Sequence, residues 1–445
     1  MAQQAATPGK RGCETDAMKT QMFLPVYRVA AQSLAPFSGL FLRRRARRGK
    51  EDLARLGERR GQAGLARPDG RLAWLHGASV GEGLALLPLV ERLKAKGFHV
   101  LVTTGTVTSA RILAQRLPEG AFHQYAPLDA PTFIECFLDH WRPDLFLLAE
   151  SEIWPNMICA VHARSIPIAS VNARLSQRSF SRWRLAPGFI SALLRRIDIC
   201  LAQSEDDAAR LLQLGAPRVH AAGNLKYDVE APPADPARLE ALATGIGPRP
   251  VWVAASTHAG EEALALLAHK QLARRFPDLL TVLAPRHAAR GDQIAALARE
   301  SGLEAAQRSR GEPLARETQV YVADTMGEMG LFYRLSSVIF VGKSLAGRGG
   351  QNPIEPAKLG SAILHGPHVG NFVDAYAALD QAGGAIEVAD ASELAQRLGL
   401  LFGDPDLLRK TAEASRASVA AMSGASDRVM RAIEPYVAAM MVSGQ

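Results

Sequence analysis

The chain repeats one pattern twice, and that pattern constrains its fold more than any other feature. A short apolar run rich in β-branched residues is followed by a loop and then by a helical stretch. The runs of the first half are RLAWLH, HVLVTTG, DLFLLAE, IPIASVN, DICLAQS and VHAAGN, and those of the second half are VWVAAS, LLTVLAP, QVYVAD, SVIFVG and SAILHG. Short buried strands that alternate with helices predict a parallel sheet covered on both faces. We therefore expect an α/β protein with two Rossmann-like doubly wound domains.

The two halves are also alike where each begins. WLHGASVGEGLALL starts at Trp74 and WVAASTHAGEEALALL starts at Trp252, and each reads as a strand, a turn of small residues and a helix that begins with Gly-Glu. Two related halves would explain this likeness, although two such units can also be alike by chance. The Pro-rich segment APPADPARLEALATGIGPRP lies between the halves, and we interpret it as a linker that can hold a short helix.

These patterns give a domain plan for the whole chain. Residues 51–230 and 250–445 are expected to form the two domains, the second with a helical tail, and residues 231–249 the linker. Residues 1–20 are polar and expected to be disordered, and residues 21–50 are expected to form a membrane-associated helix with a basic run. Two doubly wound domains that face each other would place their strand ends at a central cleft, where ligands of such sheets bind.

The positive charge of the chain lies at its N-terminus. The formal net charge is +8, and residues 1–50 contain ten Lys/Arg but only two Asp/Glu, which accounts for the whole excess. Met22–Leu42 is mainly apolar, and RRRARR follows at Arg43–Arg48. The rest of the chain is balanced, so the charge does not indicate a nucleic-acid-binding protein.

The apolar segment has the periodicity of a helix. Apolar residues recur at Phe23, Val26, Tyr27, Ala30, Leu34, Phe37 and Phe41. Two prolines and an arginine interrupt the segment, whereas a membrane span needs about 20 mostly apolar residues. An interfacial helix followed by arginines that meet anionic headgroups fits better. The alternative is a helix packed on the body of the protein beside a solvated charge run; a cleaved signal peptide is disfavoured because the charge follows the apolar run.

Neither a disulfide scaffold nor a metal site is indicated. The four cysteines stand far apart and form no C-x-x-C pair, which fits a reducing cytoplasm. Asp404-Pro405-Asp406 reads as the N-cap of a helix, and His365 and His368 lack an evident third ligand. We therefore expect no metal.

The loop after the first strand, HGASVGE from His76 to Glu82, has two interpretations. It contains G-x-S-x-G with Ser79 between a strand and a helix, which is the context of a serine hydrolase elbow. Such an elbow normally follows several strands, however, and no later Asp and His stand out as its partners. Alternatively, the glycines let a substrate approach a helix N-terminus. Glu82 then projects into the cleft, unless it is only a surface residue that stabilises the helix dipole.

Two further segments of the first half carry charged candidates. LAESEIWPN places Glu150 and Glu152 one residue apart at the end of a strand, so that the two carboxylates point in roughly the same direction. They could accept a proton, bind a sugar hydroxyl or ligate a metal, or only begin a helix. GNLKYD carries Lys226 at the interdomain boundary, where the ammonium group could pair with a phosphate or carboxylate, or remain solvated.

In the second half, three strand ends carry polar motifs: APRH, DTMGEM and RGGQNPIE. The preceding VGKS is not the end of a Walker A loop, because that motif needs a glycine where Ser337 stands. The Gly-rich segment Arg348–Gly350 leads instead into Asn352-Pro353 and Glu355. A glutamate at this place can accept hydrogen bonds from a ribose diol.

Taken together and in this order, the segments HGASVGE, ESEIWPN, GNLKYD, APRH, DTMGEM and GGQNPIEPAKLGSAILHGPHVGNF resemble the bacterial 3-deoxy-D-manno-octulosonic acid (Kdo) transferases of lipopolysaccharide assembly. The resemblance covers nearly the whole chain from about Met22. It implies a GT-B glycosyltransferase in which the second half binds the donor CMP-Kdo and the first half binds a lipid A precursor. It also implies that no cofactor is used and that the protein lies on the cytoplasmic face of the cell inner membrane.

The resemblance further implies a role for each candidate residue. Glu82 is expected to be the general base of an inverting transfer. Either Glu150 or Glu152 would support the oxocarbenium-like transition state, and Lys226 would stabilise the charge on departing CMP. The residues expected to contact CMP are Pro285, Arg286, Gly327, Glu328, Met329, Asn352, Pro353, Ile354 and Glu355. A serine hydrolase that uses Ser79 and a protein that binds the nucleotide sugar without transferring it are the alternatives.

Overall fold

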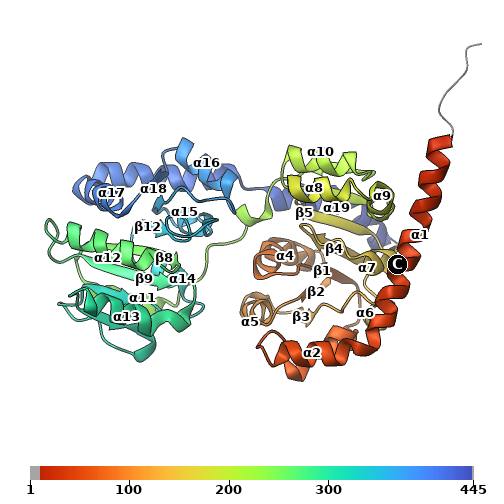
Figure 1. The fold of residues 1–445 in the computed structure, drawn as a ribbon, viewed down its shortest axis with the longest axis horizontal. Helices are drawn as coiled ribbons and strands as arrows, with labels where there is room; N and C mark the ends of the chain where they lie inside the picture. The colour runs from red at the N-terminus through yellow and green to blue at the C-terminus, as the bar shows by residue number, and fades with distance from the viewer. Residues whose placement is uncertain (1–10, 443–445) are drawn as a thin grey trace, which may run out of the picture. The chain divides into compact units, whose positions relative to one another are not determined.

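The chain folds into two α/β units, each built around one parallel sheet (Figure 1). The structure is a computed structural model that describes residues 11–442, with side chains described from residue 23 to residue 441. The first unit consists of the chain up to Val229 together with the residues from Ser423 onward, and the second unit is Glu230–Met422. The predicted class, two doubly wound domains, is confirmed.

The sheet of the first unit has seven strands in the order β3-β2-β1-β4-β5-β6-β7. Its strands are β1 (Leu72–His76), β2 (His99–Thr104), β3 (Ala121–Tyr125), β4 (Leu145–Ala149), β5 (Ile168–Ala173), β6 (Ile199–Ala202) and β7 (Val219–Ala221). Successive residues of a strand enter opposite layers, so that Ala73 and Leu75 pack in one hydrophobic cluster and Leu72 and Trp74 in the other. Burial of both faces explains why the central strands are continuously apolar.

Helices cover both faces of this sheet. Their bounds are α1 (Arg11–Leu34), α2 (Ser38–Ala46), α3 (Val80–Ala85), α4 (Leu87–Ala95), α5 (Val107–Arg116), α6 (Pro131–Trp141), α7 (Pro155–Ala163), α8 (Gln177–Trp183), α9 (Pro187–Leu194), α10 (Glu205–Gln213) and α19 (Ala425–Val442). Several begin at a Ser or Thr whose hydroxyl accepts a backbone N–H, including Ser79 before α3 and Thr106 before α5. A short 3-10 turn, η4 (Leu225–Tyr227), carries Lys226.

The second unit repeats the arrangement, with the strand order β10-β11-β9-β8-β12-β13-β14. The strands are β8 (Val251–Thr257), β9 (Leu280–Pro285), β10 (Ala305–Gln307), β11 (Val320–Val322), β12 (Val338–Val341), β13 (Ala362–His365) and β14 (Ala385–Glu387). The helices are α11 (Pro236–Ile246), α12 (Glu261–Leu272), α13 (Gly291–Glu300), α14 (Met329–Tyr333), α15 (Ile354–Lys358), α16 (Val373–Gln381), α17 (Ala391–Gly403) and α18 (Pro405–Ala421).

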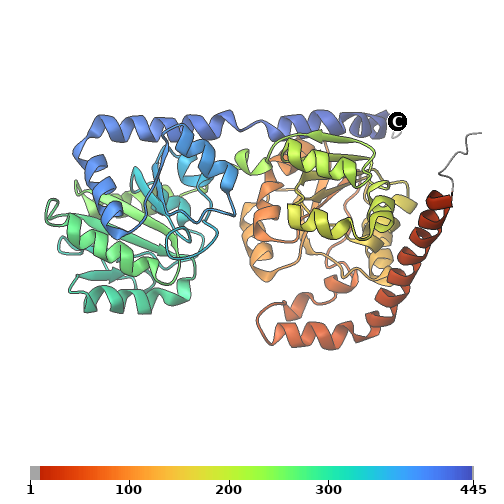
Figure 2. The same ribbon diagram turned by 45° about the horizontal axis from the view of Figure 1, so that its top comes forward.

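The structure corrects the predicted domain plan in three places. Helix α1 begins at Arg11, so residues 11–20 of the predicted disordered tail are helical, and residues 1–10 lie outside the described part of the chain. The predicted linker holds a helix, α11, as the sequence allowed, but the whole segment belongs to the second unit. The end of the chain, predicted as a tail of the second domain, returns to the first unit as α19 (Figure 2).

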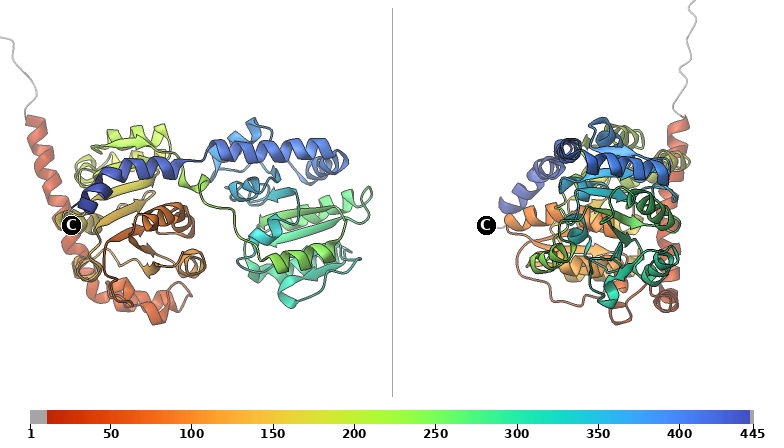
Figure 3. Two further views of the ribbon diagram at one scale, coloured as in Figure 1. Left: turned by 180° about the vertical axis from the view of Figure 1, so that it is seen from behind. Right: turned by 90° about the vertical axis from the view of Figure 1, so that its left-hand side faces the viewer.

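Helix α19 is part of the core of the first unit. Its residues Val429, Ile433 and Val437 are buried in the same cluster as Leu75 of β1. The start of the helix is fixed by Asp228, whose carboxylate accepts hydrogen bonds from the backbone N–H groups of residues 424 and 426 at 2.6 and 2.5 Å. Figure 3 shows the dark blue helix lying against this unit. Tertiary packing, which local sequence does not report, therefore decides where the chain end belongs.

Candidate active site

Glu82 lies at the start of α3, immediately after the central strand β1. Its carboxylate accepts hydrogen bonds from the backbone N–H of Ala78 at 2.6 Å and from Ser79 Oγ at 2.8 Å, while Ser79 Oγ accepts the N–H of Glu82 at 3.3 Å. This is a variant of the capping box that begins many helices. A Cβ at Gly77 would lie 2.9 Å from Cβ of Glu82, so the glycine is needed for the close approach.

The same contacts explain the G-x-S-x-G motif without a serine nucleophile. The hydroxyl of Ser79 donates to the carboxylate of Glu82, whereas a nucleophilic serine would pair with an imidazole base. Ser79 also has an ordinary extended backbone, with φ of −113°, and not the strained turn of a hydrolase elbow. The motif is therefore a helix cap.

Burial and neighbouring charge make Glu82 an unusual carboxylate. Burial is the main cause that raises its pKa, and the negative charges of Glu152 and Glu150 raise it further, against the hydrogen bonds from Ser79 and Ala78. The two acidic residues come from the loop after β4, the strand that pairs with β1. The predicted cluster of Glu82, Glu150 and Glu152 is thus assembled at the carboxyl ends of the two central strands.

Lys226 joins this cluster through an ion pair. Its Nζ lies 2.7 Å from Glu150 Oε1. Glu150 is in the left-handed region with φ of 52°, which a non-glycine residue adopts only when the surroundings hold it there. Glu152 instead accepts a hydrogen bond from Trp154 Nε1 at 2.6 Å. The structure therefore brings all four predicted residues together and gives the two acidic residues different partners.

Asn172 is a member of the site that the sequence did not indicate. It is the penultimate residue of β5, with φ of 51°; its Nδ2 lies 3.4 Å from Glu150 Oε1, and its Oδ1 accepts the N–H of Leu225 at 2.9 Å. It thereby connects the loop of Glu150 to the turn that carries Lys226. Asparagine adopts positive φ more easily than most residues, so an Asn at a strand end is a weak signal that could have identified it.

In the second unit, the VGKS segment binds a carboxylate of the protein itself. The consecutive backbone N–H groups of Lys343, Ser344 and Leu345 donate to the buried side chain of Glu261 at 2.6 to 3.0 Å, and the N–H of His258 donates at 2.9 Å. Successive N–H groups of this kind form an anion-binding nest. Like a phosphate loop, the segment binds an anion with its backbone N–H groups, but that anion is the side chain of Glu261.

The expected CMP-contacting segments meet at the carboxyl edge of the second sheet. Pro285 ends β9 and Arg286 follows it, Gly327 to Met329 lead into α14, and Asn352 to Glu355 lead into α15. Burial raises the pKa of the Tyr333 phenol, and the charge of Glu355 raises it further, whereas the charge of Arg286 lowers it. Because the charges of both residues act on this one phenol of α14, the three segments lie close together. Asn352 Nδ2 donates to Glu355 Oε1 at 3.2 Å and fixes the start of α15.

The carboxylate of Glu328 is bound by two arginines of the second unit. Arg308 binds it through two nitrogens at 2.5 and 2.7 Å, and Arg238 lies at 3.0 Å. The bonds from Arg308 are the main cause that lowers the pKa of Glu328 to about 2. The side chain therefore holds the loop in place, and the backbone of this segment is what a nucleotide can contact.

Two histidines at the same edge were not among the predicted residues. His258 and His287 approach with ring centroids 5.8 Å apart, and His258 Nε2 lies 3.0 Å from Gln351 Nε2. Burial is the first cause that lowers the pKa of His258; the charge of Glu261 acts against it, whereas Lys343 and Arg286 act in the same direction as burial. His258 directly follows β8 and His287 is the second residue after β9, positions that would have indicated them.

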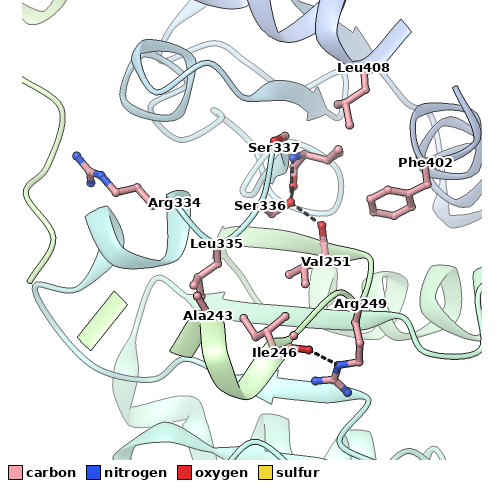
Figure 4. Close-up of a pocket in the computed structure, with 12 residues that line it drawn as sticks. Ala243, Ile246, Arg249, Val251, Arg334, Leu335, Ser336, Ser337, Phe402 and Leu408 are labelled. Carbon is pink, nitrogen blue, oxygen red and sulfur yellow. Dashed lines mark hydrogen bonds between the residues drawn. The ribbon is translucent and has the colours of Figure 1, made fainter. Parts of the chain in front are cut away.

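A cavity of about 290 Å³ in the second unit lies away from this edge. It is lined by residues near the amino ends of β8 and β12, such as Ile246, Ser336 and Phe402 (Figure 4). The guanidinium of Arg334 points away from it, and that of Arg249 turns to the carbonyl of Ile246. In doubly wound sheets ligands bind at the opposite, carboxyl edge, so we do not assign the nucleotide to this cavity.

The candidate metal residues have other contacts. Asp404 caps α18 by accepting the N–H groups of residues 406 and 407, as predicted. His365 is buried and lies 3.0 Å from Asp380 through Nε2. Among residues 11–442 the structure contains no group of three or more His, Cys, Asp or Glu side chains that could hold a metal ion.

Helices α1 and α2 expose an apolar surface. The side chains that form this apolar face are Phe23, Val26, Val29, Leu34, Phe37, Leu40 and Phe41, each more than half exposed. Tyr27, predicted on the same stripe, instead turns to the body of the unit, where its hydroxyl donates to Asp129 at 3.0 Å. None of the helices described in residues 11–442 has the length and apolar character needed to cross a bilayer.

Comparison with known proteins finds similar sequences over most of the chain. The family model described as 3-deoxy-D-manno-octulosonic-acid transferase (kdotransferase) matches residues 54–229. A probable mitochondrial 3-deoxy-D-manno-octulosonic acid transferase of Arabidopsis thaliana is 35% identical and covers 90% of this chain and 92% of its own. The 3-deoxy-D-manno-octulosonic acid transferase of Bordetella pertussis is 37% identical and covers 93% and 99%.

The arrangement of the two sheets also has counterparts among solved structures. A glycosyltransferase from Rickettsia africae matches with a TM-score of 0.56 and 15% identity, covering 83% of this chain and 98% of its own. At this identity the likeness concerns the fold alone, and it agrees with the expected GT-B architecture.

Proposed function

The chain belongs to the 3-deoxy-D-manno-octulosonic acid (Kdo) transferase family and is a glycosyltransferase, and we propose that it transfers Kdo from CMP-Kdo to a lipid A precursor with Glu82 as the general base. The observation that carries the proposal is the cluster of Glu82, Glu150, Glu152 and Lys226 at the carboxyl ends of the first sheet. A partly buried carboxylate with a raised pKa is a stronger base than an exposed one, as removal of a hydroxyl proton requires.

In the proposed reaction, one displacement transfers the sugar. Glu82 takes the proton of the acceptor hydroxyl while the hydroxyl oxygen forms a bond to the anomeric carbon of Kdo. The bond between that carbon and the phosphate oxygen breaks, and its electron pair leaves with CMP as a phosphate monoester anion. Attack from the side opposite the departing phosphate inverts the configuration at the anomeric carbon.

The two acidic residues of the ESE segment have different tasks in this mechanism. Glu150 holds Lys226 by the ion pair at 2.7 Å, and the ammonium group, which has three N–H donors, keeps two for the departing phosphate. The charge of Glu152 raises the pKa of Glu82 more than that of Glu150 does. We assign to Glu152 the stabilisation of positive charge on the sugar ring in the transition state.

We assign the nucleotide to the carboxyl edge of the second sheet. Arg286 supplies a positive charge for the phosphate, and Glu355 supplies a carboxylate for the ribose hydroxyls, as expected from the sequence. Because Glu328 is held by Arg308, the backbone around Gly327 supplies the contacts from that loop. Each of these assignments predicts weaker CMP binding when the named side chain is removed.

The donor and the acceptor can be tested together. The purified protein is incubated with CMP-Kdo and tetra-acylated lipid A precursor, and the lipid is analysed by mass spectrometry. We expect the lipid mass to increase by one or more Kdo residues, with one CMP released for each. Release of CMP without a change in the lipid would contradict the proposed acceptor, and release of none would contradict the proposed function.

We also propose that the apolar face of α1 and α2 binds the cytoplasmic surface of the inner membrane. Seven large apolar side chains are exposed on it, which is unusual for a surface that faces only water. Arg43, Arg44, Arg47 and Arg48 follow directly and are exposed to solvent, where they can meet anionic headgroups. The other face of α1 is occupied, since Arg28 pairs with Glu135 at 3.2 Å.

A vesicle-binding assay tests this surface. Phe37→Asp/Phe41→Asp should weaken co-sedimentation with phosphatidylglycerol vesicles by at least about tenfold, because each buried phenyl ring contributes about 1.5–3 kcal/mol. Leu400→Glu, at an exposed position of α17, is the matched control and should bind as the wild type does. Equal binding by all three proteins would contradict the proposal. Protection from protease added to intact spheroplasts tests the cytoplasmic side.

A further inference from the structure

His76 is a buried residue of the first unit whose second ring nitrogen has no partner. It ends β1 and is only 2% exposed, and its Nδ1 lies 2.9 Å from Thr103 Oγ1 on the neighbouring strand. No other described residue gives Nε2 a hydrogen bond, although this atom is buried. The nearest acidic group is Glu152, whose Oε2 is 3.8 Å away. Buried polar atoms are nearly always satisfied, so this one requires an explanation.

The hydrogen bonds around Thr103 favour one of the two tautomers of His76. Thr103 Oγ1 accepts the N–H of Trp74 at 2.8 Å and has one proton of its own to donate. That proton can go to His76 Nδ1 at 2.9 Å or to the carbonyl of Leu75 at 3.5 Å. The shorter contact is the better hydrogen bond. We therefore assign Nδ1 as the acceptor and place the proton of a neutral His76 on Nε2, on the side of Glu152.

We propose that His76 is a positioning residue that holds Glu152 in place for sugar transfer. The distance of 3.8 Å is about 0.9 Å longer than a normal N–H···O bond, and such bonds often shorten only when the substrate is bound. Trp154 Nε1 already donates to the same oxygen at 2.6 Å. With two donors on Oε2, the other oxygen of Glu152 is directed to the substrate.

A neutral imidazole suits this task because it orients a carboxylate without cancelling its charge. The cluster already contains one cation, Lys226, which is paired with Glu150. A second cation beside Glu152 would remove the negative charge that the developing positive sugar ring needs. The hydrogen bonds that join Trp74 and His76 to Thr103 depend on the register of β1 and β2, in which His76 pairs with Thr103. The inference rests on the proposed function, because it assumes that Glu152 faces the reacting sugar.

A double-mutant cycle tests whether His76 acts through Glu152. His76→Ala should lower kcat for Kdo transfer by about 10- to 100-fold, a usual loss when the partner that orients a reacting group is removed, and leave the KM for CMP-Kdo within about threefold. His76→Gln should recover most of the rate, because its amide N–H can donate from nearly the same place. In the Glu152→Gln background, His76→Ala should lower kcat by less than about threefold, because the effects of substituting two coupled residues are not additive.

The controls separate this role from a structural one. His162→Gln changes an exposed histidine of α7 and should leave kcat unchanged. Selective ¹⁵N labelling of histidine in the folded wild type should give His76 a protonated Nε2 and an unprotonated Nδ1. Additive losses in the cycle, or a proton on Nδ1, would overturn the proposal while an active wild type leaves the proposed function standing. An inactive wild type would instead refute the proposed function itself.

Discussion

At the scale of single residues, the two halves of the chain use a glutamate near the start of the first helix for different purposes. Glu82 and Glu261 each stand at the start of the helix that follows the first strand of their sheet. Glu261 is 1% exposed and receives four backbone N–H groups, so it is a structural anion. Glu82 is partly exposed and receives only two donors, with acidic neighbours that raise its pKa. The difference in environment makes only Glu82 a suitable base.

The pH dependence of transfer should report this environment. Glu82 must be ionised to act as a base, and its pKa is raised by burial first and by the charge of Glu152 second. We expect the acidic limb of kcat/KM to lie above the ordinary glutamate value of about 4.3. Glu152→Gln should move that limb to lower pH, because a negative neighbour is removed, although the burial effect remains. A profile measured from pH 4 to pH 8 in which the limb stays in place or moves upward would contradict this account.

The sequence indicated the charged residues of the site but not those that orient them. Glu82, Glu150, Glu152 and Lys226 stand out because charged side chains at strand ends are easily recognised. The roles of His76 and Asn172 depend on strand register and on a positive φ, neither of which is visible in a single sequence. The roles assigned to the charged residues remain predictions.

At the scale of elements, the sequence predicted the interior of both sheets and missed three of their four edge strands. The runs that we identified correspond to every central strand of the two sheets. The strands that escaped prediction, β3, β10 and β14, all lie at an edge, where part of the strand can face solvent. Their sequences, AFHQY, AAQ and AIE, accordingly lack a continuous apolar run. Burial on both faces is what makes a strand recognisable.

The nest around Glu261 should stabilise the nucleotide edge of the second unit. Glu261→Gln replaces an anion that four N–H groups surround, so some of these donors lose their acceptor. We expect the free energy of unfolding to fall by about 2 kcal/mol and CMP to bind more weakly, as measured by urea unfolding and calorimetric titration. Glu317→Gln, at an exposed position, is the control. Unchanged stability and CMP affinity would show that the nest is not needed.

At the scale of the whole molecule, the chain leaves the first unit at residue 229 and returns to it at residue 423. The predicted boundary at residue 250 placed everything after it in one domain, because helices follow one another without a break in composition. Only the burial of Val429, Ile433 and Val437 beside β1 shows that α19 completes the first core. The first unit is therefore built from two separate stretches of the chain, whereas the second is built from one.

A chain that ends at Met422 should destabilise one unit selectively. Each of the three buried aliphatic side chains of α19 contributes about 1.5–3 kcal/mol, and their joint loss is comparable with the total stability of a domain, about 5–15 kcal/mol. We expect the first unit to unfold at a lower temperature or to be cleaved rapidly by protease, while the second unit still binds CMP. Loss of CMP binding with an intact first unit would contradict the assignment of α19.

The most direct test of the proposed mechanism is Glu82→Gln. The amide keeps the size of the side chain and an oxygen for the N–H of Ala78, but it cannot take a proton from the acceptor. The substitution should not lower the free energy of unfolding at pH 7. Because the pKa of Glu82 is raised in the folded state, the carboxyl group stabilises the fold below the pKa of the unfolded chain, and this contribution is lost as the pH rises through the folded pKa. Glu91→Gln, at an exposed position of α4, is the matched control.

The measurement is the rate of Kdo transfer to the lipid acceptor together with the affinity for CMP. Removal of a general base typically costs 10²- to 10⁴-fold, so we expect kcat to fall by at least about 100-fold. CMP affinity should stay within about twofold, because the nucleotide is assigned to the second unit. A Glu82→Gln protein that transfers Kdo at the wild-type rate would contradict the central claim that this carboxylate is the base.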